Sequence, residues 1–402
     1  MNKLDDILRR HTVHGEETRG KLLGAAFVVT SKDATLYSGS SGRLRLDVDS
    51  PPFTEHTFTW VASLTKLVTS IAVMQLVQRG RLSLDADLRP LVPELRDARI
   101  LRAMDRDGRP AYERNTRPIT MRQLLTHTSG FSYEFADPVL LAWSRSAPGR
   151  DVSRMHWSRL EISTPLRFAP GQGWAYGVGV DWAGQVVEAV TGGPLSRHVR
   201  DHILRPLGLA DTGFWPERHP QTAPRTAQNV ERTRSGRLRP AAWPTPHEHE
   251  MESGGAGLFT TASDYAALLR GFLRGSLVSD DTVRAMLAPQ LDEAQAERMR
   301  DVATHPRVRN TFVPEFADGQ DINHGLGGML NVGDVPGKRR GGSMAWSGIL
   351  NSRWWADPTT GIAAVLVVNV RPNGDPIVAK LYDELERAVY AHLLGDASKS
   401  RI

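Results

Sequence analysis

Strand-like segments lie near both ends of this chain, whereas the sequence between them is typical of helices. Near the start, residues 21–32 and 34–44 predict two paired strands that join at a tight turn around Asp33. Three more predicted strands and a closing amphipathic helix follow at 342–348, 352–358, 361–370 and 375–394. The sequence therefore predicts an α/β fold: an antiparallel sheet built from both chain ends, flanked by helices, with an all-helical lobe inserted between them.

This arrangement predicts one catalytic unit over residues 1–402 with two lobes. We place residues 1–75 and 255–402 in the α/β lobe and residues 76–254 in the helical lobe. Two polar stretches without periodicity stand apart. Residues 214–252 read as a long surface excursion, and residues 289–325 as an irregular lid or acceptor loop.

Composition narrows the function classes. The net charge is only +5 and there is no basic run, which argues against nucleic acid as a partner. There are no cysteines, so disulfides, thiolate metal sites and cysteine nucleophiles are absent. The charged start at 1–15 lacks the apolar core of an export signal, and the apolar run 361–370 is too short to span a bilayer. We expect a cytoplasmic protein without a membrane anchor.

The most informative side chain is a lysine near the start of the apolar helix predicted over 60–76. An ammonium group buried in an apolar interior is costly unless it is paired or loses its proton. Lys66 lies three residues after Ser63, so both side chains share one helix face and come within hydrogen-bond reach. Burial favours the neutral amine, which can accept the serine proton, and arginine could not do so. The alternative is a helix-start serine beside a paired or snorkelling lysine.

Two further segments offer what a serine–lysine pair still needs, a proton relay and oxyanion donors. Tyr176 lies in a glycine-rich turn just before a predicted helix that opens on Asp181 as its cap. Ser63 N–H at the helix start is one candidate oxyanion donor. The other candidate is the N–H of Ile349, which follows a predicted strand containing the residues Trp346, Ser347 and Gly348. A packing tyrosine and an ordinary edge strand are the alternatives.

Together these segments resemble the serine β-lactamase and penicillin-binding-protein superfamily, whose motifs include Ser-x-x-Lys. The order and spacing resemble its class C-like branch, closest to family VIII carboxylesterases and related natural-product transesterases. Five blocks carry the resemblance, at 61–85, 119–131, 168–192, 202–214 and 254–269. It covers roughly residues 20 to 395. It implies a β-lactamase-like fold with Ser63 as the nucleophile, Lys66 as its base and Tyr176 as the proton shuttle.

Two departures from the β-lactamase pattern concern the substrate. Where β-lactamases carry Tyr-x-Asn, Val178 replaces the asparagine, and where they carry Lys-Thr-Gly, Trp346 replaces the lysine. The missing groups would bind an amide and attract a substrate carboxylate. Further tryptophans suggest a cleft wall for neutral, apolar acyl or alcohol groups. These are Trp174, Trp354 and Trp355.

The sequence thus predicts a serine hydrolase that forms an acyl-enzyme on Ser63, a carboxylesterase or ester-forming acyltransferase. Its expected partners are a small-molecule ester or acyl donor and an alcohol or amine acceptor. We expect neither a metal nor another cofactor, because the histidines at 11–14 and 247–250 lack zinc-motif spacing. His127 is expected to be a hydrogen-bonded structural residue at a helix end. The alternatives are a β-lactamase or D,D-peptidase, and a non-catalytic sensor or binding domain of the same fold.

Overall fold

A seven-stranded antiparallel sheet forms the centre of the computed structural model, which describes residues 3–314, 316 and 319–393. The strand order is β2-β1-β13-β12-β11-β10-β9. These strands are β1 (Gly24–Ser31), β2 (Thr35–Gly42), β9 (Ile322–His324), β10 (Met329–Asn331), β11 (Ser343–Ser347), β12 (Arg353–Asp357) and β13 (Ile362–Val368). In the sheet β1 pairs with β13, with Ala25 opposite Val368, so the prediction of a sheet built from both chain ends is confirmed.

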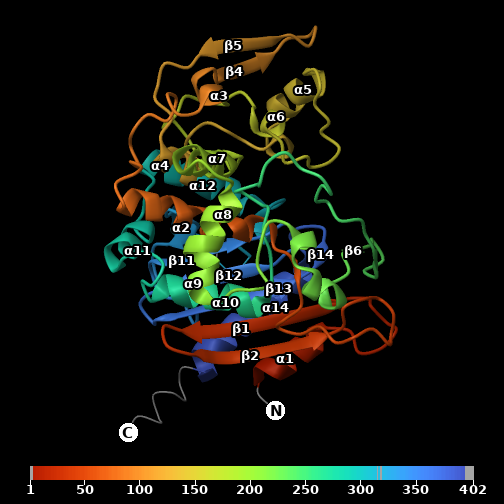
Figure 1. Ribbon diagram of the computed structural model, residues 1–402. Helices are drawn as coiled ribbons and strands as arrows, with labels where there is room; N and C mark the ends of the chain where they lie inside the picture. Colours follow the sequence, from red (N-terminus) through yellow and green to blue (C-terminus); the bar gives the residue numbers. More distant parts are fainter. Residues whose placement is uncertain (1–2, 315, 317–318, 394–402) are drawn as a thin grey trace.

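Helices cover both faces of the sheet, which explains why β1 and β13 are almost continuously apolar. Alternate residues of each strand point to opposite faces. On one face, Phe27 and Leu366 pack with α1 (Lys3–His11) and α14 (Pro376–Ala388). On the other face, the core contains α2 (Thr65–Gln78) and α10 (Ala262–Leu273). In Figure 1, α1 lies beside β2, and α2 lies toward the inserted lobe.

The inserted segment contains α3 (Pro93–Arg96), α4 (Met121–Leu125), α5 (Pro138–Ser146), α6 (Arg159–Ile162), α7 (Gly179–Thr191), α8 (Leu195–Val199) and α9 (Arg205–Leu207). The helices α3, α5 and α6 lie at the end of the molecule opposite β1 and β2, whereas α8 and α9 lie lower, near α2 and α10 (Figure 1). The lobe also contains a hairpin that the sequence did not predict, β4 (Arg99–Met104) with β5 (Pro110–Arg114). Across the described residues, no helix has both the length and the apolar character needed to cross a bilayer.

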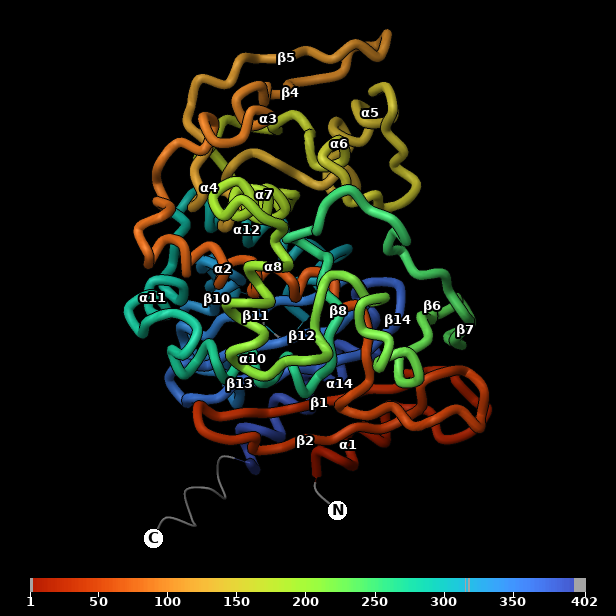
Figure 2. The backbone as a smooth tube through the Cα atoms, viewed as in Figure 1, coloured from red at the N-terminus to blue at the C-terminus, as the bar shows by residue number. Residues whose placement is uncertain are grey.

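The polar stretch 214–252 returns to the α/β lobe. Here β6 (Val230–Arg232) pairs with β7 (Leu238–Pro240) and with β14 (Val370–Arg371) near the chain end. Figure 2 shows this small sheet beside the main one. Residues 230–240 therefore pair with the α/β lobe, although we had assigned them to the helical lobe. One more short pair of strands joins β3 (Thr59–Trp60) to β8 (Phe259–Thr260). The strand β3 ends three residues before Ser63 in the chain.

The prediction that 289–325 is irregular was wrong. Asp292 caps α12 (Glu293–Thr304) with a capping box completed by Gln295, and α13 (Arg309–Phe312) follows. The helix that precedes this stretch, α11 (Asp280–Met286), is capped by Ser279. Most side chains of α12 face the solvent, and the only buried ones of this helix are Ala296, Met299 and Ala303. Its apolar face is therefore narrow, so the sequence shows little hydrophobic periodicity there.

Candidate active site

Ser63 lies in a 3₁₀ turn, Ala62–Leu64, that runs directly into α2. The backbone before it is in the left-handed region, because Ala62 has a φ of +47°, a conformation that is uncommon for a residue with a side chain. Side chains hold this turn in place: Tyr265 OH donates to Leu64 O over 2.8 Å, and Thr65 Oγ1 donates to Ala62 O. The serine is thus presented by a fixed turn at the start of a buried helix.

Lys66 is only 3% exposed, and its amine lies between the catalytic candidates. Its Nζ donates to Ser63 Oγ over 3.2 Å, to Tyr133 OH over 3.3 Å and to Gly255 O over 2.8 Å. No carboxylate forms an ion pair with Lys66 anywhere in the part of the chain that the structure describes. The amine is therefore buried against neutral oxygen atoms, one of which is the candidate nucleophile.

Tyr176 approaches the serine from the inserted lobe. Its OH donates to Ser63 Oγ over 2.7 Å, and Lys66 Nζ lies 4.8 Å from the centre of its ring. The backbone on both sides is held close to the 127–133 segment, because Tyr133 N donates to Tyr176 O over 3.1 Å. A Cβ on Gly177 would lie 2.5 Å from Phe131 O, so glycine permits this close approach. The structure thus brings together the three residues that the sequence proposed as catalytic.

A second phenol, which sequence reasoning missed, completes the group. Tyr133 OH lies 3.3 Å from Lys66 Nζ, and the rings of Tyr133 and Tyr176 meet edge to face with centroids 5.0 Å apart. Burial, together with Tyr176, Asp181 and Glu161, raises the pKa of Tyr133 well above its usual value. This phenol stays protonated. The only feature of the sequence that could have indicated Tyr133 is its position, two residues after the block 119–131 that carries the family resemblance.

Asp181 supports the lysine indirectly. The prediction that it caps a helix was wrong, because α7 begins at Gly179 with Val178 as its N-cap. Its carboxylate instead accepts hydrogen bonds from Ser253 Oγ (2.5 Å) and Gly255 N (3.0 Å). Since Gly255 O accepts from Lys66 Nζ, the carboxylate fixes the residue whose carbonyl group holds the amine.

The end of β11 supplies the candidate oxyanion donor. The strand stops at Ser347, so Gly348 follows it rather than lying inside it as predicted. A Cβ on Gly348 would lie 2.5 Å from Val61 O, so glycine lets this segment pack against the turn before Ser63. Within the described residues, the N–H of Ile349 has no hydrogen-bond partner. The hydroxyl of Ser347, by contrast, already has a partner, because it donates to Thr311 O in α13 over 2.8 Å.

Aromatic rings surround these groups on the side of β11. The ring of Trp346 lies 5.3 Å from that of Tyr176, and Phe312 of α13 lies 5.6 Å from Tyr176. Trp354 and Trp355, in contrast, are fully buried in the cores on opposite faces of the sheet. The prediction that they line the cleft was wrong. Trp174 is 2% exposed and also packs in the core.

Two buried histidines lie behind the lysine. The ring of His127 is 4.9 Å from Tyr176 and 5.4 Å from His324. Burial lowers the pKa of His324 to about 4 and that of His127 well below its usual value, and Lys66 contributes to both shifts. Both rings are therefore neutral near pH 7, and His127 does not act as the base of a triad. Its Nδ1 has no hydrogen-bond partner among the described residues, contrary to our expectation for this residue.

A serine in a fixed turn, hydrogen-bonded to a lysine amine and a phenol at the end of a strand of an antiparallel sheet, is the arrangement of a serine enzyme with a β-lactamase-like fold. The chain belongs to the Beta-lactamase family, which matches residues 8–387. It is 33% identical to the lovastatin esterase of Penicillium rubens over 92% of this chain and 95% of that protein. It is 31% identical to the ML-236A carboxylate methylbutanoyltransferase of Penicillium citrinum, over 85% of this chain and 83% of the relative.

A solved structure shares the fold. A mutant of simvastatin synthase (LovD) from Aspergillus terreus superimposes with a TM-score of 0.88 at 29% identity, covering 98% of this chain and 95% of that one. The predicted fold and family are confirmed. The chain is an enzyme of the esterase and acyltransferase group within this family, as the sequence predicted. These relatives do not support the alternatives of a penicillin-directed enzyme or a non-catalytic sensor.

Proposed function

We propose that Ser63 is the nucleophile of an esterase or acyltransferase that works through an acyl-enzyme. The observation that carries the proposal is the position of Ser63 Oγ, 3.2 Å from Lys66 Nζ and 2.7 Å from Tyr176 OH. A hydroxyl is a weak nucleophile until an adjacent base removes its proton. Lys66, in its neutral form, is the base within reach, and the resemblance to the family assigns the same role to this position.

The proposed acylation step follows from this arrangement. Ser63 Oγ attacks the carbonyl carbon of an ester while its proton passes to Lys66 Nζ. The oxyanion of the tetrahedral intermediate accepts hydrogen bonds from the N–H groups of Ser63 and Ile349. The bond from carbon to the leaving oxygen then breaks, and Tyr176 delivers a proton to that oxygen. Lys66 returns a proton to Tyr176, which leaves an ester on Ser63.

The second step decides between hydrolysis and transfer. An alcohol, an amine or water attacks the acyl group, its proton passes through Tyr176 to Lys66, and Ser63 Oγ leaves as the hydroxyl. We propose that a bound acceptor competes with water, because one relative is a methylbutanoyltransferase and another is an esterase. The ring of Phe312 supports this proposal, since it meets the ring of Tyr176 edge to face and adds an apolar side chain beside the reacting phenol.

We also propose neutral, apolar acyl groups as the substrates. Trp346 stands where β-lactamases carry a lysine, and its ring contacts both Tyr176 and Phe312. An aromatic face at this place gives apolar contact area and no charge for a substrate carboxylate. We expect the protein to act in the cytoplasm, which cell fractionation would test.

Labelling tests the nucleophile. The protein is treated with a fluorophosphonate and the adduct is located by mass spectrometry, with Ser63→Ala as the control. We expect the adduct on Ser63 and none in the variant. An adduct on another serine would overturn the mechanism. Acyl transfer is tested by adding alcohols or amines at millimolar concentration and measuring new ester or amide against free acid.

A further inference from the structure

The helix α13 is too short to keep its place by itself. It consists of four residues, Arg309–Phe312, whereas isolated helices shorter than about 12–15 residues are marginal in water. Its own backbone contributes only a few hydrogen bonds, such as that from Phe312 N to Val308 O over 3.1 Å. Contacts from other parts of the protein therefore have to fix this helix.

Two cross-strand neighbours of the main sheet supply these contacts. Ser347 at the end of β11 lies opposite Arg353 in β12. Ser347 Oγ donates to Thr311 O over 2.8 Å. Arg353 Nη2 donates to the same oxygen over 3.1 Å and also to Asn310 O. Carbonyl groups at the end of a helix carry partial negative charge and need donors of this kind. The end of α13 is thus bonded to the sheet.

The carbonyl group that Ser347 binds belongs to the peptide that continues into Phe312. The ring of Phe312 meets that of Tyr176 edge to face, with centroids 5.6 Å apart, and that of Trp346 at 6.2 Å. Phe312 is only partly buried, so part of its ring is open to a substrate. Tyr176 OH lies 2.7 Å from Ser63 Oγ. The hydroxyl of Ser347 therefore holds the backbone of an apolar ring that lies beside the reacting phenol.

This bond limits what else the hydroxyl of Ser347 can do. A serine hydroxyl carries one proton, and here Thr311 O accepts it. The hydroxyl therefore donates to α13 and not to a substrate. We expect its effect on the reaction to pass through the helix.

The ring of Phe312 lies where the second substrate has to react. In the proposed second step, Tyr176 receives the proton of the attacking nucleophile, so the oxygen of that nucleophile must come to Tyr176 OH. An apolar alcohol at this place gains contact with the ring of Phe312, whereas water does not. The ring can favour the alcohol only while it is held against Tyr176.

We propose that Ser347 is a positioning residue: by holding the end of α13 it keeps Phe312 against Tyr176 and favours an apolar alcohol over water as the acceptor. This inference rests on the proposed function and adds to it a residue that determines the class of acceptor. In the transfer, the alcohol oxygen forms the new bond to the acyl carbon, and its proton passes by way of Tyr176 to Lys66. The bond from the acyl carbon to Ser63 Oγ breaks, and Oγ takes up the proton from Lys66.

A product ratio measures the preference for the alcohol. With p-nitrophenyl butyrate as the donor, benzyl alcohol at millimolar concentration competes with water, and benzyl butyrate and butyric acid are measured by chromatography. Ser347→Ala should lower the ratio of ester to acid by about two- to tenfold, the effect of one neutral hydrogen bond. Ser347→Thr keeps the hydroxyl and should restore the ratio. The ratio is internal to each variant, so a general loss of activity does not change it. A wild-type ratio in Ser347→Ala would overturn the inference, as would a wild-type protein that hydrolyses the donor but forms no benzyl butyrate.

A double-mutant cycle shows whether Ser347 acts through Phe312. Phe312→Ala alone should also lower the ratio by about two- to tenfold, because an aromatic pair contributes an effect of this size. If Ser347 acts by positioning the ring, Ser347→Ala causes no further fall once the ring is absent. Full, additive losses would mean that Ser347 contacts the substrate itself, and they would refute the positioning role. An unchanged ratio in Phe312→Ala would refute it equally.

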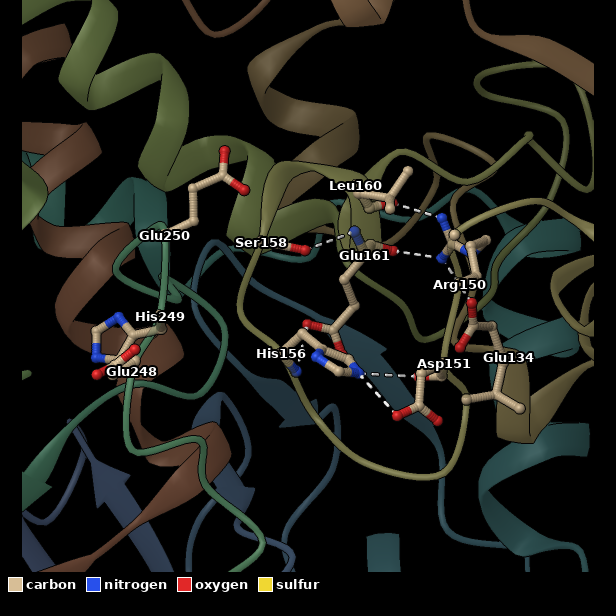
Figure 3. A pocket seen from close by; sticks show the side chains of 12 residues that line it. Glu134, Arg150, Asp151, His156, Ser158, Leu160, Glu161, Glu248, His249 and Glu250 are labelled. Carbon is tan, nitrogen blue, oxygen red and sulfur yellow. Dashed lines mark hydrogen bonds and ion pairs between the residues drawn. The ribbon is translucent and has the colours of Figure 1, made fainter.

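Two other serines provide matched controls. Ser343 lies at the other end of β11 and donates to Arg340 O over 2.7 Å. Ser158 accepts from Glu161 N over 3.1 Å at the start of α6, in the inserted lobe (Figure 3). Both hydroxyls are bonded away from α13, so Ser343→Ala and Ser158→Ala should keep the wild-type ratio. A fall as large as that in Ser347→Ala would show that the ratio responds to any lost serine hydrogen bond, and would overturn the assignment.

Fluorine NMR separates this inference from the proposed function, because it does not depend on turnover. The full-length Ser63→Ala protein is labelled with 4-fluorophenylalanine, and the signal of Phe312 is identified by its loss in Phe312→Leu. We expect Ser347→Ala to shift or broaden this signal and Ser347→Thr to restore it. If the wild-type protein releases no p-nitrophenol but the signal responds in this way, the proposed mechanism fails and the positioning of Phe312 by Ser347 stands. A signal that stays the same in Ser347→Ala refutes the positioning.

Discussion

The two tyrosines at the site should differ in their effect on catalysis, and the structure predicts by how much. Tyr176 OH contacts the nucleophile Ser63 Oγ at 2.7 Å, whereas Tyr133 OH lies 3.3 Å from Lys66 Nζ, beside Tyr176, and makes no hydrogen bond to Ser63. The second distance lies at the long end for a hydrogen bond. Lys66 also keeps Gly255 O at 2.8 Å when Tyr133 is changed. Tyr133→Phe therefore removes weak positioning contacts to Lys66 and Tyr176 and leaves the hydrogen bond between Tyr176 and Ser63 intact.

A neutral hydrogen bond contributes about 0.5–1.5 kcal/mol, which corresponds to a loss of about two- to tenfold in rate. A group that transfers a proton contributes typically 10²–10⁴-fold. We therefore expect Tyr133→Phe to lower kcat/KM by about two- to tenfold and Tyr176→Phe to lower it by about 10²-fold or more. Because the pKa of Tyr133 is raised well above its usual value, Tyr133→Phe should leave the shape of the pH–rate profile unchanged.

The assay is hydrolysis of p-nitrophenyl butyrate between pH 6 and 10, together with the rate of fluorophosphonate labelling. Tyr37→Phe makes the same chemical change at a remote site, where the phenol donates to Asp5 Oδ1 over 2.7 Å, and should leave kcat/KM unaffected. A loss of 10²-fold or more in Tyr133→Phe, with a small loss in Tyr176→Phe, would show that Tyr133 relays the proton.

Three further predictions concern the base, the substrate and the buried histidines. Lys66→Arg should lower the acylation rate by about 10²-fold or more, since arginine stays protonated and cannot accept the serine proton; near-normal burst kinetics would refute the role of the amine. Short-chain p-nitrophenyl esters should be turned over much faster than nitrocefin because Trp346 replaces the lysine, and comparable kcat/KM values would contradict this. Burial lowers the pKa of His324 from 6.5 to about 4, so the unfolded state binds a proton between these pH values that the folded state does not. The free energy of unfolding should therefore fall by up to about 3 kcal/mol as pH drops from 6.5 to 4; thermal unfolding should show a smaller fall in His324→Gln.

The sequence predicts well those features that depend on local pattern. The helix α2 begins within two residues of Ser63, and the spacing of three residues places Lys66 Nζ 3.2 Å from Ser63 Oγ. The apolar run of β13 is buried on both faces, as its composition indicates. These features follow from helix and strand periodicity, which a single sequence displays directly.

Contacts between distant segments were not predictable in this way. Tyr133 reaches Lys66 across 67 residues of sequence, and nothing in the spacing of either residue indicates the contact. Asp181 resembles a helix cap in the sequence, but its carboxylate is used by Ser253 and Gly255, more than seventy residues away. Tertiary hydrogen bonds of this kind override a local capping preference.

The tryptophans of β12 show a different limit. Trp354 and Trp355 are adjacent in a strand, and adjacent strand residues point to opposite faces. At most one of them could have faced a cleft above the sheet, so strand geometry alone excludes the wall that we predicted from composition. Both are in fact enclosed by the two cores. Trp346 also belongs to the core on one face, but it lies one residue from the end of β11 and its ring contacts that of Tyr176.

The choice between hydrolysis and transfer depends on how the acyl group on Ser63 meets its second substrate. Water is the most concentrated nucleophile present, so an acceptor can compete only if it is held beside the acyl carbon. Well-oriented groups reach effective concentrations of about 10⁵–10⁸ M, which is enough to outcompete water. The structure offers apolar rings beside the reacting phenol, because Phe312 and Trp346 both contact the ring of Tyr176. An acceptor packed on these rings would place its hydroxyl near the phenols that move the proton. Binding at a site removed from the reacting bond would thus determine which nucleophile receives the acyl group.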